Sequence, residues 1–345
     1  MTSRFRPGSL IAGLGVALVV VTVVALGSGA VHIAPSDVVS ILLHHAGIGD
    51  GGGAGDTADA VLWAIRLPRV VLGIAVGAGL AVAGAALQGI FRNPLADPQL
   101  IGISSGAAAG SAIGVLALES AIGGIAGTIG AFAGGLAAGA AVYSLARHRG
   151  RTEVVTLVLA GIAVAAVGGA LAGFLSVIAD DPRLGSPLFY SLGGLGVATW
   201  RLVGLTLPLI AIGVVALPWY ASRLDLILLG EREAAHLGVD VERLRRQVLV
   251  LVTVVVGATV AAAGVIGFVG LLVPHAVRLV AGPGHRIVLP ASALGGAVLV
   301  VAADTVARTV ALPLEVPVGL LTALAGGPLF LWLLRRTRSE HGGWG

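Results

Sequence analysis

Arginine is the residue type whose placement in this sequence could carry chemistry. The chain has 345 residues and 21 basic side chains, all of them arginine, and it contains no cysteine. Without cysteine there are no disulfides and no thiolate sites. Without lysine there is no G-K-[ST] phosphate-binding loop and no Schiff base, so any ATP must be hydrolysed by another chain. What remains is charge recognition by the guanidinium group, which pairs with a carboxylate through two parallel hydrogen bonds.

Histidine and the acidic residues offer few alternatives. His44 and His45 are neighbours, and successive side chains on a helix point in different directions, which favours a solvated pair over a metal site. Asp304 and Arg308 have the four-residue spacing at which helical side chains pair. The sequence contains no series of intramembrane carboxylates for proton coupling, no cluster of nucleophile, base and metal ligands, and no aromatic and basic patch typical of nucleic-acid binding.

Membrane helices must position these side chains. The composition is 57% hydrophobic and 11% charged, whereas soluble domains carry about a quarter charged residues. The apolar runs are continuous, which excludes a barrel, and each span needs about 20 residues. We predict an all-α polytopic membrane protein, one domain over 1–345, with about ten spans: 10–26, 70–90, 100–118, 122–145, 154–178, 202–220, 248–263, 268–280, 288–306 and 316–334. The first run is longer than the core of a signal peptide, the alternative interpretation.

The distribution of arginine predicts the orientation of the spans. Positive side chains accumulate in cytoplasmic connections, and an inner amino terminus places most of the arginines there, including those of the charged block 223–246. Both termini are then cytoplasmic, and residues 31–69 form an outer segment. Against this bias, the outer connections hold Arg66, Arg69, Arg183, Arg201 and Arg308, which need another explanation.

The span 70–90 is rich in glycine and alanine, which allow helix backbones to approach closely in lipid. We therefore expect this helix to be surrounded by other helices. Its segment V-G-A-G-L-A-V-A-G at 76–84 is echoed by V-G-A-T-V-A-A-A-G at 256–264, in a span that should run in the opposite direction. This pattern favours an inverted internal repeat, which places a transport path at the interface of its halves.

A series of motifs extends over nearly the whole chain. They are R-L-P-R at 66–69, G-x-x-L-Q-G-x-x-R-N-P-L-A-D-P at 84–98, I-G-x-S-S-G-A at 101–107, G-F-V-G-L-L-V-P-H-x-x-R at 267–278, D-x-x-A-R at 304–308 and E-x-P-V-G-L-L-T-A at 315–323. In these motifs the chain resembles the FecCD-type permease family, the membrane subunits of ATP-driven importers for iron-siderophores, haem and cobalamin.

The resemblance implies a permease dimer, here a homodimer, around a central path in a bacterial inner membrane. It implies two cytoplasmic ATP-binding subunits, which hold ATP and Mg, so this chain needs no cofactor or metal of its own. It also implies a periplasmic or lipid-anchored substrate-binding protein outside. Arg66, Arg69 and Arg308 match the family's outward arginines that receive carboxylates of that protein. The alternative is that they reach lipid phosphates at the membrane interface.

The resemblance also assigns roles inside the membrane and at its inner face. The block 223–246 matches the coupling loop, two short helices that bind the ATPase, rather than a merely solvated loop; it is centred on Gly230, Glu231, Ala235, Leu237 and Gly238. Spans 5 and 10 match path-lining helices. An inner gate lies at 151–156 and an outer gate at 176–190, and the path and gate residues are Thr152, Thr156, Gly161, Ala165, Gly168, Ala172 and Ser176.

The remaining motif residues are structural in this interpretation. Asn93, Pro94 and Asp97 shape a polar hairpin after span 2, and Pro274 and His275 lie near the inner end of span 8. His275 could ligate a metal or haem, but the family pattern favours a capping role. We expect an import permease for haem or a ferric siderophore, with I-S-S-G-A and the segment 189–200 most similar to haem permeases. Cobalamin is an alternative, as is a stand-alone secondary transporter or channel.

Overall fold

The computed structural model describes residues 7–48, 55–148, 151–179 and 192–340, which are almost entirely helical. The helices are α1 (Pro7–Gly27), α2 (Pro35–His45), α3 (Asp56–Ala60), α4 (Leu67–Ile90), α5 (Ile103–Ile122), α6 (Ala126–Ala146), α7 (Val154–Ala179), α9 (Trp200–Ala216), α10 (Ala221–Leu229), α11 (Glu231–His236), α12 (Val241–Ala263), α13 (Val269–Ala281), α14 (His285–Ala307) and α15 (Val318–Glu340). The short elements are the π-helix η1 (Val61–Arg66), the 3-10 helices η2 (Pro98–Ile101) and η4 (Leu217–Tyr220), and the paired strands β1 (Arg147–His148) and β2 (Arg151–Thr152).

The predicted polytopic helical fold is confirmed. In the described part of the chain, eight helices are long and apolar enough to cross a membrane, and α13 and α15 provide two shorter apolar helices. Their positions match the ten predicted spans. The largest boundary difference is α12, which begins at Val241 rather than at 248. It starts early because the Asp240 carboxylate accepts a hydrogen bond from the Arg243 amide at 3.0 Å and caps the helix.

Helix α4 lies at the centre of the molecule, as its small residues predicted. Nearly nine-tenths of its apolar window, 89%, is buried inside the protein. A Cβ atom on Gly77 would lie 2.2 Å from the Gly296 carbonyl oxygen of α14, and one on Gly84 would lie 1.9 Å from the Gly270 carbonyl oxygen of α13. No side chain fits these crossings, so glycine is required at both. Helix α12, which contains the echoed segment, also packs against α4.

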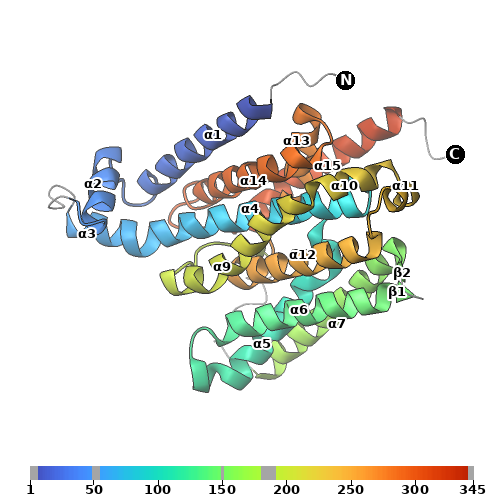
Figure 1. Ribbon diagram of the computed structural model, residues 1–345. Helices are drawn as coiled ribbons and strands as arrows, with labels where there is room; N and C mark the ends of the chain where they lie inside the picture. Colours follow the sequence, from blue (N-terminus) through green and yellow to red (C-terminus); the bar gives the residue numbers. More distant parts are fainter. Residues whose placement is uncertain (1–6, 49–54, 149–150, 180–191, 341–345) are drawn as a thin grey trace.

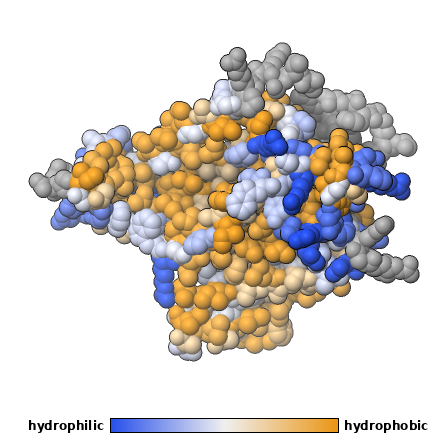
Figure 2. Space-filling view, viewed as in Figure 1, coloured by the Kyte–Doolittle hydropathy of each residue, from blue (hydrophilic) through white to orange (hydrophobic). Residues whose placement is uncertain are grey.

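The two ends of the helix bundle differ in character. In Figure 1, α2 and α3 lie at one end, whereas α11 and the β1–β2 hairpin lie at the other, together with the start of α1 and the end of α15. Figure 2 shows hydrophobic residues over much of the visible face, with hydrophilic residues gathered toward the α10–α11 end. Following the predicted orientation, we refer to the α2–α3 end as the outer end and to the α11 end as the inner end.

Candidate functional site

At the outer end, Arg66 and Arg308 bind backbone carbonyls at the end of α1 and just after it. The final carbonyls of a helix lack partners within it and favour positive charge. The Arg66 Nη1 atom donates to the Leu26 carbonyl at 2.7 Å, and Arg308 Nη1 donates to the Ser28 carbonyl at 3.0 Å. The Nη2 atom of Arg66 donates to the Val31 carbonyl, and that of Arg308 donates to the Ala25 carbonyl. Both arginines are therefore buried by backbone groups of their own chain, with 4% and 7% exposure.

Arg69 joins three segments at the same end. Its Nε atom lies 2.9 and 3.0 Å from the two carboxylate oxygens of Asp304 in α14. Its Nη1 atom lies 3.0 and 2.9 Å from those of Glu315, which precedes α15. The expected pair Asp304–Arg308 is present at 3.7 Å, but the short contacts of Asp304 go to Arg69. Since Arg69 and Asp304 are buried, their opposite charges compensate for the loss of water around each.

The three outer arginines thus have partners inside the chain, which their assignment to docking did not foresee. The family pattern indicated their end of the molecule but not the acceptors, because backbone carbonyls have no signature in the sequence. Arg69 borders a cavity of about 300 Å³, which is also lined by Glu315 and by residues 192–197 and 316–318. The Glu315 side chain is 52% exposed, so this is where a partner's charge can reach the cluster.

An aromatic cluster that sequence reasoning missed lies near the outer end. The imidazole ring of His45 stacks on Trp63 with centroids 3.9 Å apart, and its Nε2 atom lies 3.0 Å from Asp59 Oδ1. Trp63 lies against Trp200, whose indole nitrogen donates to the Trp63 carbonyl at 2.9 Å. His45 is therefore held by packing and by a carboxylate, and the cluster ties α2 and η1 to the start of α9.

At the inner end, the charged block forms the predicted pair of short helices. Gly230 and Gly238 bracket α11 with φ angles of 136° and 85°, which only glycine adopts without strain. Ala235 and Leu237 are exposed, with Leu237 at 60%. Glu231 is bound by Arg245 of α12 at 2.5 Å. The segment therefore presents a short helix bounded by two glycines, with mostly charged residues exposed along it and Leu237 exposed at its end.

Arg245 and Glu242 were not singled out from the sequence, yet they organise this end. Arg245 is 2% exposed and also contacts Glu242 at 2.6 Å and the Thr152 carbonyl at 3.1 Å. Thr152 donates its backbone amide and its hydroxyl to Glu242, each at 3.1 Å. The signal that could have found them is the three-residue spacing of opposite charges at the start of a helix.

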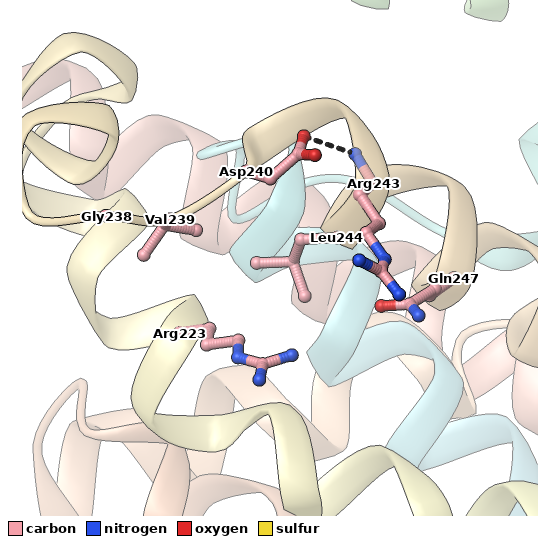
Figure 3. Close-up of a pocket in the computed structure, with 7 residues that line it drawn as sticks. All are labelled: Arg223, Gly238, Val239, Asp240, Arg243, Leu244 and Gln247. Atoms are coloured by element: carbon pink, nitrogen blue, oxygen red, sulfur yellow. Dashed lines mark hydrogen bonds between the residues drawn. The ribbon is translucent and has the colours of Figure 1, made fainter.

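A second cavity lies beside the coupling segment. Its volume is about 310 Å³, and it is lined by Arg223, Gly238, Val239, Asp240, Arg243, Leu244 and Gln247. Figure 3 shows that these residues come from α10, from the segment after α11 and from α12. The Asp240 carboxylate is engaged in capping α12, as the dashed line marks. The cavity adds a basic, partly apolar recess to the inner surface.

Several of the predicted path residues of α7 are packed against other elements of this chain. Gly161, Gly168 and Ala172 lie on the face that packs against η2 and α5, and a Cβ on Gly168 would lie 2.9 Å from the Ser105 carbonyl carbon. Ala165 continues this stripe and is half-buried. The open face of α7 instead carries large apolar side chains: Val155, Leu159, Ile162, Val167, Phe174 and Val177. The small residues are needed for close packing of helices, which the sequence alone could not distinguish from a path wall.

The gate residues are bound locally. Thr156 donates its hydroxyl to Glu153 at 2.9 Å, and Ser176 donates to the Ala172 carbonyl at 2.9 Å. Of the residues expected at the inner gate, Thr152 therefore lies in β2 and Thr156 in the first turn of α7. Residues 180–190 of the expected outer gate lie outside the described residues.

The polar hairpin after α4 has the expected turn chemistry. Asn93 Oδ1 accepts the Leu95 amide at 2.9 Å, and Asp97 Oδ1 accepts the Gln99 amide at 2.8 Å, while Pro94 is exposed. Burial against its neighbours raises the pKa of Asp97 to about 6, although the hydrogen bond from Gln99 opposes the shift. The hairpin therefore contains a carboxylate that titrates near neutrality.

The capping role expected for His275 is not what the structure shows. His275 is half-buried in the middle of α13, and the described contacts give its ring no hydrogen bond. The adjacent Pro274 has no N–H, so it cannot satisfy the Gly270 carbonyl one turn earlier. Gln88 of α4 does so instead, with Nε2 at 3.1 Å from that oxygen. Gln88 also accepts from Arg278, which donates to the Ala85 carbonyl at 3.2 Å.

The chain is similar to a family of known transport proteins. The model of the FecCD transport family matches residues 17–336. The chain is 48% identical to the cobalamin import system permease protein BtuC of Halobacterium salinarum, over 82% of this chain and 75% of the relative. It is 46% identical to the hemin transport system permease protein HmuU of Yersinia pestis, over 81% and 84%, respectively. It is 40% identical to the Fe(3+) dicitrate transport system permease protein FecD of Escherichia coli, over 81% and 86%.

Solved structures agree with the sequence matches. A structure described as an inward-facing conformation of a metal-chelate type ABC transporter has a TM-score of 0.81 at 31% identity, covering 95% of this chain and 99% of that chain. The chain is thus a multi-pass protein of the bacterial inner membrane, and ATP hydrolysis in such importers belongs to partner subunits. With ten apolar helices in the described part of the chain and these matches, the chain belongs to the FecCD transport family, as a permease subunit of an ABC importer for metal chelates, haem, siderophores or cobalamin.

Proposed function

We propose that this permease imports an iron chelate, haem or a ferric siderophore, rather than cobalamin. The motif I-S-S-G-A at 103–107 and the segment 189–200 are the features most similar to haem permeases, and a hemin permease is among the relatives. The similarity to a cobalamin permease makes cobalamin the alternative. The chain would act as a homodimer with two ATP-binding subunits at the inner end and a binding protein at the outer end.

The observation that supports this assembly most is the contrast between the two ends. The inner end offers α11 with the exposed Leu237 and its two bracketing glycines, which suits a groove on an ATPase. The outer end offers the Arg69–Glu315 pair beside a cavity of about 300 Å³. A carboxylate of the binding protein would compete with Glu315 for Arg69. In this proposal Arg66 and Arg308 support docking by holding the end of α1 in place.

Reconstitution tests the proposed substrate. The permease, its ATP-binding subunits and the cognate binding protein are placed in liposomes, and uptake of haem, ferric siderophores and cobalamin is measured with and without ATP. We expect ATP-dependent uptake of haem or a ferric siderophore, matched by binding of the same chelate to the binding protein. Uptake of cobalamin alone would overturn the proposed substrate, and uptake by the permease without its ATPase would overturn the proposed mechanism.

A further inference from the structure

We propose that Arg245 is a positioning residue that links the coupling helix α11 to the inner gate, so that a movement of α11 is transmitted to the start of α7. The inference rests on the proposed function, because it needs an ATPase that moves α11. It adds a specific joint between two elements that are distant in sequence.

The geometry of the guanidinium group carries the inference. Arg245 Nη2 reaches Glu231 of α11 at 2.5 Å, and Nη1 reaches both Glu242 of α12 at 2.6 Å and the Thr152 carbonyl of β2 at 3.1 Å. The side chain of Arg245 is 2% exposed, whereas that of Glu231 is 51% exposed. One planar cation therefore sits beneath the surface and joins three elements. Lysine could not join them in the same way, because it lacks the fixed fork of donors.

On the gate side of this joint, Thr152 is bound by both Glu242 and Arg245. Glu242 accepts the Thr152 amide and hydroxyl at 3.1 Å each, so Thr152 is bound through its amide, hydroxyl and carbonyl. The next residue, Glu153, donates its amide to the Ala146 carbonyl at 3.1 Å, and α7 begins at Val154. A displacement of Arg245 would therefore reach the first turn of α7 within two residues.

On the coupling side, glycine stands at both ends of α11. Gly230 and Gly238 flank α11 with φ angles of 136° and 85°, so its connections can turn where other residues would be strained. The contacts that hold α11 include the buried side chain of Ala234 and the Glu231–Arg245 pair. Without that pair, α11 could follow the ATPase while the gate stayed in place. This predicts hydrolysis that is uncoupled from transport.

The test uses the full complex and measures both how well hydrolysis is coupled to transport and how α11 moves relative to the inner gate. The variants Arg245→Met, Arg245→Lys and Glu231→Gln are compared with the control Glu233→Gln, which alters an exposed carboxylate on the same helix. The first readout is chelate transported per ATP hydrolysed. The second is the distance between spin labels at Arg232→Cys and Glu153→Cys, measured with and without nucleotide, which the absence of native cysteine makes possible.

We expect the ratio to fall at least tenfold in Arg245→Met and less in Arg245→Lys, which keeps the charge. In the unmodified complex, the label distance should stay constant when nucleotide is exchanged, because α11 and the gate move together. It should change with nucleotide in Arg245→Met and Glu231→Gln. Glu231→Gln tests the inference even if Arg245→Met does not assemble, since Arg245 keeps its bond to Glu242. A normal ratio and a constant distance in Glu231→Gln would overturn the inference, whereas failure of the unmodified complex to transport any chelate would instead overturn the proposed function.

Discussion

A single exposed carboxylate decides how the outer arginine cluster can take part in docking. Arg66 and Arg308 bind backbone carbonyls, and Arg69 is shared by the buried Asp304 and the exposed Glu315. Exchange of one carboxylate for another costs little when the leaving group can enter water, as Glu315 can with a side chain 52% exposed. Arg69 is therefore the guanidinium group that an incoming carboxylate can reach.

We predict opposite effects for the two partners of this pair. Glu315→Gln removes the competing charge and should tighten binding of the binding protein, whereas Arg69→Met should weaken it and reduce the stimulation of ATP hydrolysis. The measurement is the Kd of the binding protein for the complex at low salt, since exposed charge effects are screened by salt. Weaker binding in Glu315→Gln would show that Glu315 itself, and not the exchange, serves docking.

A second prediction concerns the carbonyl left free by a proline. Gln88→Leu should lower the free energy of unfolding by about 1–3 kcal/mol, because the buried Gly270 carbonyl loses the donor that replaces the missing N–H of Pro274. In a Pro274→Ala background the helix supplies that N–H, so the same change should cost less. Thermal or denaturant unfolding of the four proteins gives the coupling between the two sites. An equal loss of stability in both backgrounds would show that Gln88 stabilises the fold through its bond with Arg278 and not through the Gly270 carbonyl.

These side chains mark the limit of what the sequence could predict. The motif L-Q-G and the outer R-L-P-R were visible as patterns, and so was the pair Asp304–Arg308. The acceptors of Gln88, Arg66 and Arg308 are backbone carbonyls brought close by folding from as far as 283 residues away, as for Arg308 and Ala25. Such acceptors are independent of residue type, so no spacing rule could identify them.

The surroundings of a helix could be predicted where its composition has one explanation, as in α4. They stayed open where the composition fits two explanations, as in α7. The small residues of α4 predicted its central position, because glycine allows backbones to touch. In α7 the same composition was consistent with a path wall or with close packing. Within the chain, Gly161 and Gly168 lie against Gly102 and Ser105, which are about 60 residues earlier in the sequence.

The hairpin between α4 and α5 should give the permease a measurable dependence on pH. Asp97 has a folded pKa of about 6, above its ordinary value of 3.8, so folding favours its protonated form. Its contribution to stability is fully present below pH 3.8 and is lost as the pH rises through about 6. Asp97→Asn keeps an oxygen for the Gln99 amide and removes the titration. We expect the variant to be more stable at pH 7.5, by up to about 3 kcal/mol, and to match the parent at pH 4.

Thermal unfolding of the purified permease across this pH range measures the difference between the two proteins, which removes the contribution of other titrating groups. Glu119→Gln, at a half-buried carboxylate on the outer part of α5, is the control for removal of an acidic group. A constant difference between Asp97→Asn and the parent from pH 4 to 7.5 would show that Asp97 does not titrate in this window.

The exposed apolar face of α7 must be covered by lipid or by another chain in the complete importer. Val167 and Val177 are 69% and 81% exposed in the single chain, and the basic and acidic groups gather at the two ends instead. In lipid such a face is compatible with acyl chains or with a second copy, because burial against either removes it from water. A symmetric pair of copies would place the same face of both on either side of one axis, where a transport path can form.

We therefore predict that spin labels on this face report a short distance between two copies. One label per chain at Val167→Cys should give a shorter distance in the assembled complex than one at Val16→Cys, which lies on the exposed face of α1. The cysteine-free chain supplies the background for both. The comparison uses positions of similar exposure and apolarity, so it separates a shared axis from simple contact with lipid. A shorter distance for Val16 than for Val167 would place the axis at α1 and assign the open face of α7 to the surrounding membrane.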